Sequence, residues 1–172
     1  DEFDRSFLDL KYKIAIITSL FWGDHLDYFK DENEMLGAFA EFISRIPPGG
    51  FLIVNGDEES AVFLARQARC RVLNYGIKQG KDVQIRNIRQ DPERTVFSLI
   101  SEERSLEVEL HVPGRHNILN ATAALIASEI LGVDISQAIS AISEYKGVKR
   151  RMEIKGNRKG VIVVDDFAPA GP

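Results

Sequence analysis

The sequence predicts an α/β fold, a mostly parallel sheet with flanking helices plus a small antiparallel β meander, and two observations support this. The first is a regular alternation of elements. Apolar residues at helical spacing end before Pro47 and precede an apolar strand at 51–54, and a second helical segment, 57–68, precedes a strand at 71–75. Such cycles favour parallel strands, because each crossover helix packs back onto the sheet. Another β-branched strand, 14–18, comes before them.

The second observation is a change of character in the middle of the chain. Three β-rich runs, 83–88, 95–100 and 106–112, are separated by short polar segments typical of turns. We expect them to form an antiparallel meander appended to the main sheet. Two helices follow, over about 117–131 and 135–144.

Composition indicates one soluble domain from a reducing compartment. The chain has 172 residues, 44% hydrophobic and 28% charged, and its single cysteine, Cys70, excludes an internal disulfide. No run approaches about 18 apolar residues and the acidic start is unlike a signal peptide, so we expect a cytoplasmic protein with no membrane partner. The net charge of −4 argues against nucleic-acid binding, although the run from Lys146 to Lys159 is basic.

One helix start carries polar groups suited to a nucleotide. The segment Gly114-Arg-His-Asn-Ile-Leu-Asn120 opens the apolar helix near 117–131. Free N–H groups and the positive end of the helix dipole attract anions, and His and Asn side chains can bind a base or a ribose. The simpler alternative is that Asn117 caps the helix and His116 satisfies a loop carbonyl.

Acidic residues also follow two apolar strands. Asp165 and Asp166 end the β-branched segment 161–167, and ligands of open α/β sheets are usually bound at the carboxyl ends of strands. Asp24-His-Leu-Asp27 follows the strand at 14–18 and supplies an imidazole and two carboxylates. We interpret this second group as a corner that could hold a divalent metal.

Five ordered motifs resemble the signatures of the Mur ligases. They are Asp1-Glu-Phe-Asp-Arg-Ser-Phe-Leu8, Asp24-His-Leu-Asp-Tyr28, Gly114-Arg-His-Asn-Ile-Leu-Asn-Ala-Thr-Ala-Ala124, Gly147-Val-Lys-Arg-Arg151 and Asp165-Asp-Phe-Ala168. The resemblance implies a P-loop-NTPase-like central ATP-binding domain over residues 1–168, incomplete at its N-terminus because no Gly-x-x-x-x-Gly-Lys-Ser/Thr loop is present. Residues 169–172 depart from the family pattern and form a divergent or cloning-derived tail.

The resemblance also implies a reaction. ATP with Mg²⁺ would convert the carboxylate of UDP-N-acetylmuramate to an acyl phosphate, and an amine would displace phosphate to form an amide bond. The acceptor would be L-alanine or, in the related recycling ligase, a tripeptide. Such chemistry depends on positioning and on neutralising phosphoryl charge.

Site residues follow from the same resemblance. His25 matches the histidine that helps hold the divalent metal, although imidazole is a less usual Mg²⁺ ligand than oxygen. Arg151 matches an arginine directed at the phosphates, and Asp166 an acid that binds the ribose hydroxyls. His116 and Asn117 match positions at the adenine end. Asn120 lies one turn further along the same helix face.

Other functions stay open from the sequence. The isolated chain could be a nucleotide-binding fragment without activity, as the missing phosphate loop suggests. A folylpolyglutamate synthase-like ligase shares the acyl-phosphate chemistry, and the basic run 146–159 could bind nucleic acid, although it lacks interleaved aromatic residues. Between the two muramate ligases we rank addition of L-alanine slightly ahead.

Overall fold

The structure is a computed structural model, which describes residues 5–20, 28–91, 94–102, 104–151 and 153–167. A 3-10 turn, η1 (Ser6–Leu8), comes before the regular elements. The strands are β1 (Ile14–Ile17), β2 (Phe51–Asn55), β3 (Arg71–Gly76), β4 (Val83–Gln90), β5 (Thr95–Ile100), β6 (Ser105–Leu110), β7 (Glu153–Arg158) and β8 (Val161–Asp165). The helices are α1 (Glu32–Ser44), α2 (Glu59–Ala65), α3 (Arg115–Ile130) and α4 (Ile135–Ser143). None of the helices within these ranges is long and apolar enough to cross a membrane.

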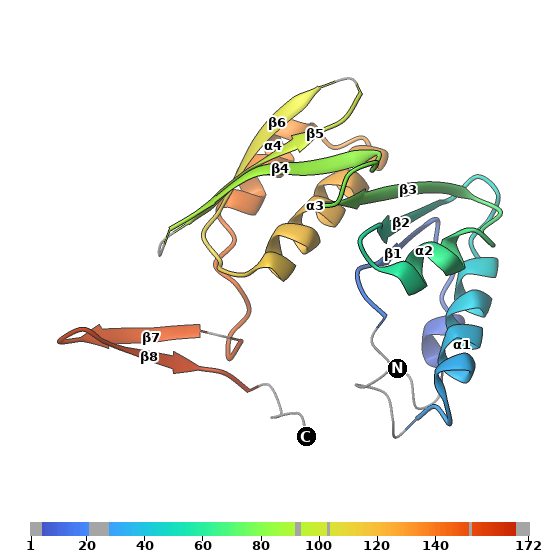
Figure 1. Cartoon of the computed structure of the whole chain (residues 1–172), viewed down its shortest axis with the longest axis horizontal. Helices are drawn as coiled ribbons and strands as arrows, with labels where there is room; N and C mark the ends of the chain where they lie inside the picture. The colour runs from blue at the N-terminus through green and yellow to red at the C-terminus, as the bar shows by residue number, and fades with distance from the viewer. Residues whose placement is uncertain (1–4, 21–27, 92–93, 103, 152, 168–172) are drawn as a thin grey trace.

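Six strands form one sheet in the order β1-β2-β3-β4-β5-β6 (Figure 1). The first three pairings are parallel, and the β4–β5 and β5–β6 pairings are antiparallel. The predicted α/β class and the predicted meander are therefore confirmed. The meander is continuous with the parallel strands, because β4 itself pairs with β3.

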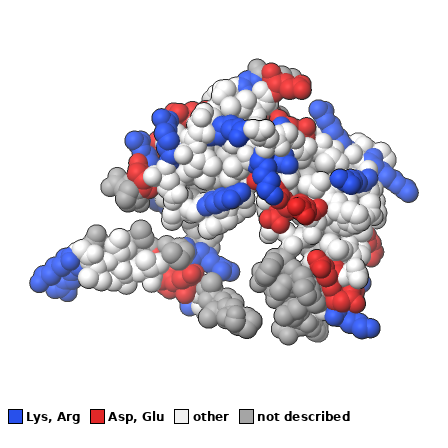
Figure 2. Space-filling view, viewed as in Figure 1, with Lys and Arg blue, Asp and Glu red and all other residues white. Residues whose placement is uncertain are grey.

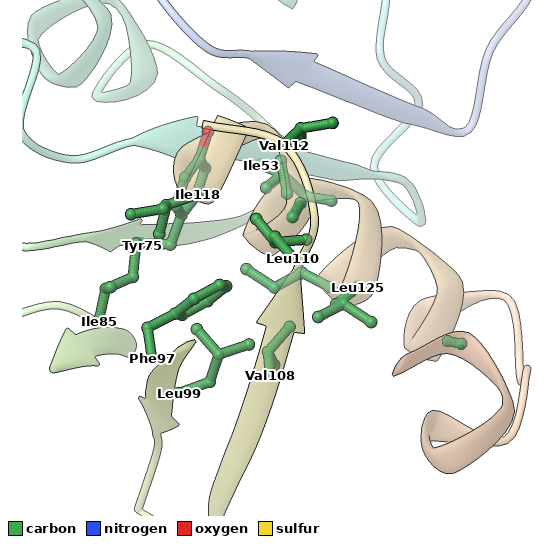
Figure 3. Close-up of a cluster of buried hydrophobic side chains, with 14 residues drawn as sticks. Ile53, Tyr75, Ile85, Phe97, Leu99, Val108, Leu110, Val112, Ile118 and Leu125 are labelled. Carbon is green, nitrogen blue, oxygen red and sulfur yellow. The ribbon is translucent and has the colours of Figure 1, made fainter. Parts of the chain in front are cut away.

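Helices cover the two faces of the sheet in pairs. Strand β2 shows this best, because its side chains alternate between the faces and are buried on both. Ile53 joins the cluster under α3 and α4, whereas Leu52 and Val54 join the cluster under α1 and α2. Tyr75 and Phe97 are among the largest side chains of the first cluster (Figure 3). The sheet is thus a middle layer between two pairs of helices.

Strand β8 differs from the prediction. It was expected to deliver its carboxylates at the edge of the main sheet, but it pairs with β7 in a separate two-stranded sheet that lies apart in Figure 1. The turn explains the pairing, because Lys159 and Gly160 have φ of 52° and 82°, as a two-residue hairpin loop requires. Figure 2 shows this hairpin as a largely uncharged surface with basic side chains at its tip. Residues Val161 to Val164 are all exposed.

Gly50 tests the packing at the start of β2. A Cβ added there would lie 2.6 Å from the carbonyl oxygen of Lys13 and 2.7 Å from Cγ2 of Ile46. We expect Gly50→Ala to lower the free energy of unfolding by roughly 1–3 kcal/mol, since the backbone must shift to relieve the overlap. Gly49→Ala is the matched control, because no atom lies within 4 Å of its added Cβ. Urea unfolding measures both, and equal stability losses would contradict this packing.

Candidate functional site

The carboxyl ends of β1 and β2 are joined by one buried side chain. Asn55, the last residue of β2, is only 2% exposed. Its Nδ2 donates to the carbonyl oxygen of Thr18, just after β1, at 3.0 Å. Its Oδ1 accepts the N–H of Asp57 at 3.1 Å. The amide therefore fixes the loop that leaves β2 against the end of β1.

Asp57 extends this connection to β3 and α3. Its side chain is 6% exposed and accepts the N–H groups of Ile77 at 2.8 Å and Lys78 at 3.0 Å, directly after β3. Nη2 of Arg115, the first residue of α3, lies 3.6 Å from Asp57 Oδ2. The helix predicted over 57–68 begins only at Glu59, so Asp57 lies in the loop that leaves β2 and not in α2. The signal that was missed is Asn55-Gly-Asp57 directly after a buried strand.

The start of α3 brings the predicted adenine-end residues together. The helix begins at Arg115, two residues earlier than expected, because Gly114 serves as its N-cap with φ 103° and ψ 139°. The imidazole of His116 folds back over Gly114, whose added Cβ would lie 2.6 Å from His116 Cε1. Asn117 Nδ2 donates to the carbonyl oxygen of Pro113 at 2.6 Å. Asn120, one turn later, is exposed on the same side.

Arg151 and Asp166 lie on a second pair of segments, which contact each other through their neighbours Arg150 and Phe167. The N–H of Phe167 donates to the carbonyl oxygen of Arg150 at 2.8 Å, and the Arg150 guanidinium lies 4.3 Å from the centroid of the Phe167 ring. Arg151 and Asp166 are the neighbours of these residues, and both are exposed. The Arg150 guanidinium, which packs on the Phe167 ring, thus joins the two segments.

The chain between α4 and Arg151 passes close to the start of α3. A Cβ added at Gly147 would lie 3.3 Å from Cγ1 of Val112, two residues before Gly114. Across the ranges that the structure describes, no hydrogen bond or ion pair joins His116, Asn117 or Asn120 to Arg151. The structure therefore forms two groups of predicted residues rather than one.

His25 lies outside the described residues, together with Asp24 and Asp27. Elsewhere, within the part of the chain that the structure describes, no group of three or more His, Cys, Asp or Glu side chains could hold a metal ion. The Mg²⁺ site therefore stays a prediction that depends on His25.

A cavity of about 800 Å³ lies away from both groups of residues. It opens beside Phe51 and Arg71, the first residues of β2 and β3. The C-terminal half of α3 also lines it, through Leu125, Ile126, Glu129 and Ile130. The cavity thus lies at the N-terminal ends of the parallel strands, whereas ligands of open α/β sheets bind at the carboxyl ends. The chemistry of the polar residues, rather than the cavity volume, locates the candidate site.

A buried phenol lies between the sheet and the start of α3. Tyr75 belongs to the same buried cluster as Ile118, which lies in the first turns of α3 (Figure 3). This hydroxyl is buried, and it has no hydrogen-bond partner among the residues that the structure describes. Burial raises the pKa of Tyr75 to about 12, and the negative charge of Asp57 adds to the rise.

The raised pKa of Tyr75 predicts a loss of stability at alkaline pH. An unfolded tyrosine ionises near pH 10, whereas the folded protein keeps this proton to about pH 12. Ionisation of Tyr75 therefore leaves the free energy of unfolding unchanged below about pH 10 and lowers it as pH rises toward 12. We expect Tyr75→Phe to reduce this alkaline loss and to be neutral or stabilising at pH 7, because the hydroxyl is unsatisfied. Urea unfolding midpoints measured at pH 7 and at about pH 12 test this expectation. The matched control is Tyr145→Phe, because Tyr145 is exposed.

The chain thus forms an open α/β domain in which hydrogen-bonding side chains lie at the carboxyl ends of the parallel strands. A family model described as the Mur ligase middle domain matches residues 3–128. The chain therefore belongs to the Mur ligase family, as its motifs predicted. The UDP-N-acetylmuramate–L-alanine ligase of Clostridium kluyveri is 40% identical over 169 residues, covering 97% of this chain and 36% of that relative.

Solved structures show the same fold. The UDP-N-acetylmuramate-alanine ligase of Thermotoga maritima has a TM-score of 0.80 at 24% identity, covering 98% of this chain and 37% of that one. A murein peptide ligase of Psychrobacter arcticus has a TM-score of 0.71 at 26% identity, covering 94% and 33%. The chain spans only about a third of the length of these relatives.

Proposed function

We propose that this chain is the nucleotide-binding domain of an ATP-dependent ligase that joins L-alanine to UDP-N-acetylmuramate. The observation that carries the proposal is the 40% identity to the Clostridium kluyveri enzyme over 97% of the chain. The murein peptide ligase favours the tripeptide as an alternative acceptor, but its identity is only 26%. The missing phosphate loop leads us to expect that these 172 residues alone have no ligase activity.

The start of α3 fits the adenine end of ATP. The Asn117 amide donates through Nδ2 to Pro113, which directs Oδ1, an acceptor, to the other side of the amide. An acceptor there matches the exocyclic amine of adenine. His116 and Asn120 supply further polar groups on the same exposed surface, and the first N–H groups of the helix add positive potential.

Arg151 and Asp166 fit the ribose and phosphate end. Asp166 is an exposed carboxylate that would accept hydrogen bonds from ribose hydroxyls, and Arg151 is an exposed guanidinium with forked donors for phosphate oxygens. When bound, ATP and Mg²⁺ supply the phosphoryl group and part of the charge neutralisation. His25 would help to hold the metal, and Arg151 would stabilise the negative charge that develops on the transferred group.

Phosphate release by the full-length protein tests the proposal. With ATP, Mg²⁺ and UDP-N-acetylmuramate present, we expect release that depends on L-alanine. Release that depends only on L-alanyl-γ-D-glutamyl-diaminopimelate would identify the recycling ligase instead. Release with folate and glutamate, but with neither of these amines, would contradict the assignment to a muramate ligase.

A further inference from the structure

Asp57 is a nearly buried carboxylate that the proposed reaction does not use. Burying an ionised carboxylate is costly unless hydrogen bonds and a positive charge compensate. Here the N–H groups of Ile77 and Lys78 both donate to it, and Nη2 of Arg115 lies 3.6 Å away. The carboxylate thus connects the loop after β3 to the first residue of α3.

The end of β3 is shaped around this carboxylate. A Cβ added at Gly76 would lie 2.5 Å from Asp57 Oδ1 and 2.8 Å from Cγ, so a side chain there would displace the group. The backbone of Asp57 is held as well, because its N–H donates to Asn55, which also binds the carbonyl oxygen of Thr18. The position of the carboxylate is therefore fixed from three strand ends.

We propose that Asp57 is a positioning residue for the nucleotide site, which it serves by holding the start of α3 through Arg115. Arg115 directly precedes His116 and Asn117, so a fixed Arg115 fixes the first turn that presents them. The inference rests on the proposed function, because it assigns that turn to ATP. Binding to a turn held in place in advance avoids the entropy cost of ordering it.

Kinetics of the full-length protein test the proposal. Asp57→Asn keeps the shape but loses the charge, and we expect the KM for ATP to rise about tenfold while kcat stays within about threefold. Arg115→Ala should raise the KM in the same direction, since its side chain is 64% exposed and its loss leaves the core intact. The double variant should have nearly the same KM for ATP as Asp57→Asn alone, because both substitutions remove the same ion pair between Asp57 and Arg115.

Asp82→Asn is the matched control. Asp82 also accepts a backbone N–H of β3, that of Asn74 at 2.7 Å, but no described contact joins it to α3. We expect its KM for ATP to be unchanged. A lower melting temperature of Asp57→Asn with an unchanged KM would overturn the proposal, because that result is the mark of a purely structural role.

Backbone chemical shifts separate this proposal from the proposed function. In the 172-residue chain without nucleotide, Asp57→Asn should shift the amide signals of residues 115–117, and Asp82→Asn should not. Absence of those shifts would overturn the positioning role even if the ligase assay succeeds. Shifts at 115–117 in a protein whose full-length form turns over no ATP would defeat only the proposed function.

Discussion

Gly114→Ala is expected to raise the KM of the full-length protein for ATP by at least about tenfold, which corresponds to about 1.4 kcal/mol of lost binding. Gly114 has φ 103° and ψ 139°, a backbone conformation that residues other than glycine rarely adopt. Its added Cβ would lie 2.6 Å from Cε1 and 2.9 Å from Nδ1 of His116. The imidazole must then move away from its place at the start of α3.

Gly132→Ala separates displacement of His116 from backbone strain. Gly132 follows the other end of α3 with φ 80°, and no atom lies within 4 Å of its added Cβ. This variant should therefore lose stability, by about 1 kcal/mol, and keep its affinity for ATP. If Gly114→Ala binds ATP as tightly as the wild type, the first turn of α3 is not the adenine site.

The strands of the main sheet and the helices that cover it could be predicted from their patterns of apolar residues. Each pattern depends on whether one face or both faces of the element are buried. Strand β2 is a continuous apolar run because it is buried on both faces, and that pattern shows in the sequence without any neighbour. The polar group at the start of α3 could also be predicted, since Gly, His and Asn side chains precede an apolar helix. Both features depend on residues close together in the chain.

The connection through Asp57 could not be predicted in the same way. Its partners are Ile77, Lys78 and Arg115, which are far apart in sequence, and an aspartate before an apolar segment looks like a helix cap. The pairing of β8 was missed for another reason. Its apolar residues are typical of a buried parallel strand, yet the turn at Lys159 and Gly160 pairs it with β7.

Arg151→Ala is expected to lower kcat by about 100-fold or more, because a guanidinium aimed at a developing phosphoryl charge acts chiefly in the transition state. Binding of adenosine should change little, since Arg151 would meet the phosphates and not the base. Turnover by the full-length protein and calorimetry with adenosine measure the two effects. Equal losses for ATP and adenosine would contradict the assignment of Arg151 to the phosphates.

Arg150→Ala is the matched control for this prediction, because it removes the neighbouring positive charge, which contacts the Phe167 ring. The Arg150 guanidinium lies 4.3 Å from the centre of the Phe167 ring and holds the segments on which Arg151 and Asp166 lie. We expect its loss to loosen both residues and to raise the KM for ATP by a few-fold, with a much smaller fall in kcat. A fall in kcat as large as that of Arg151→Ala would mean that general positive charge, rather than one directed guanidinium, serves the phosphates.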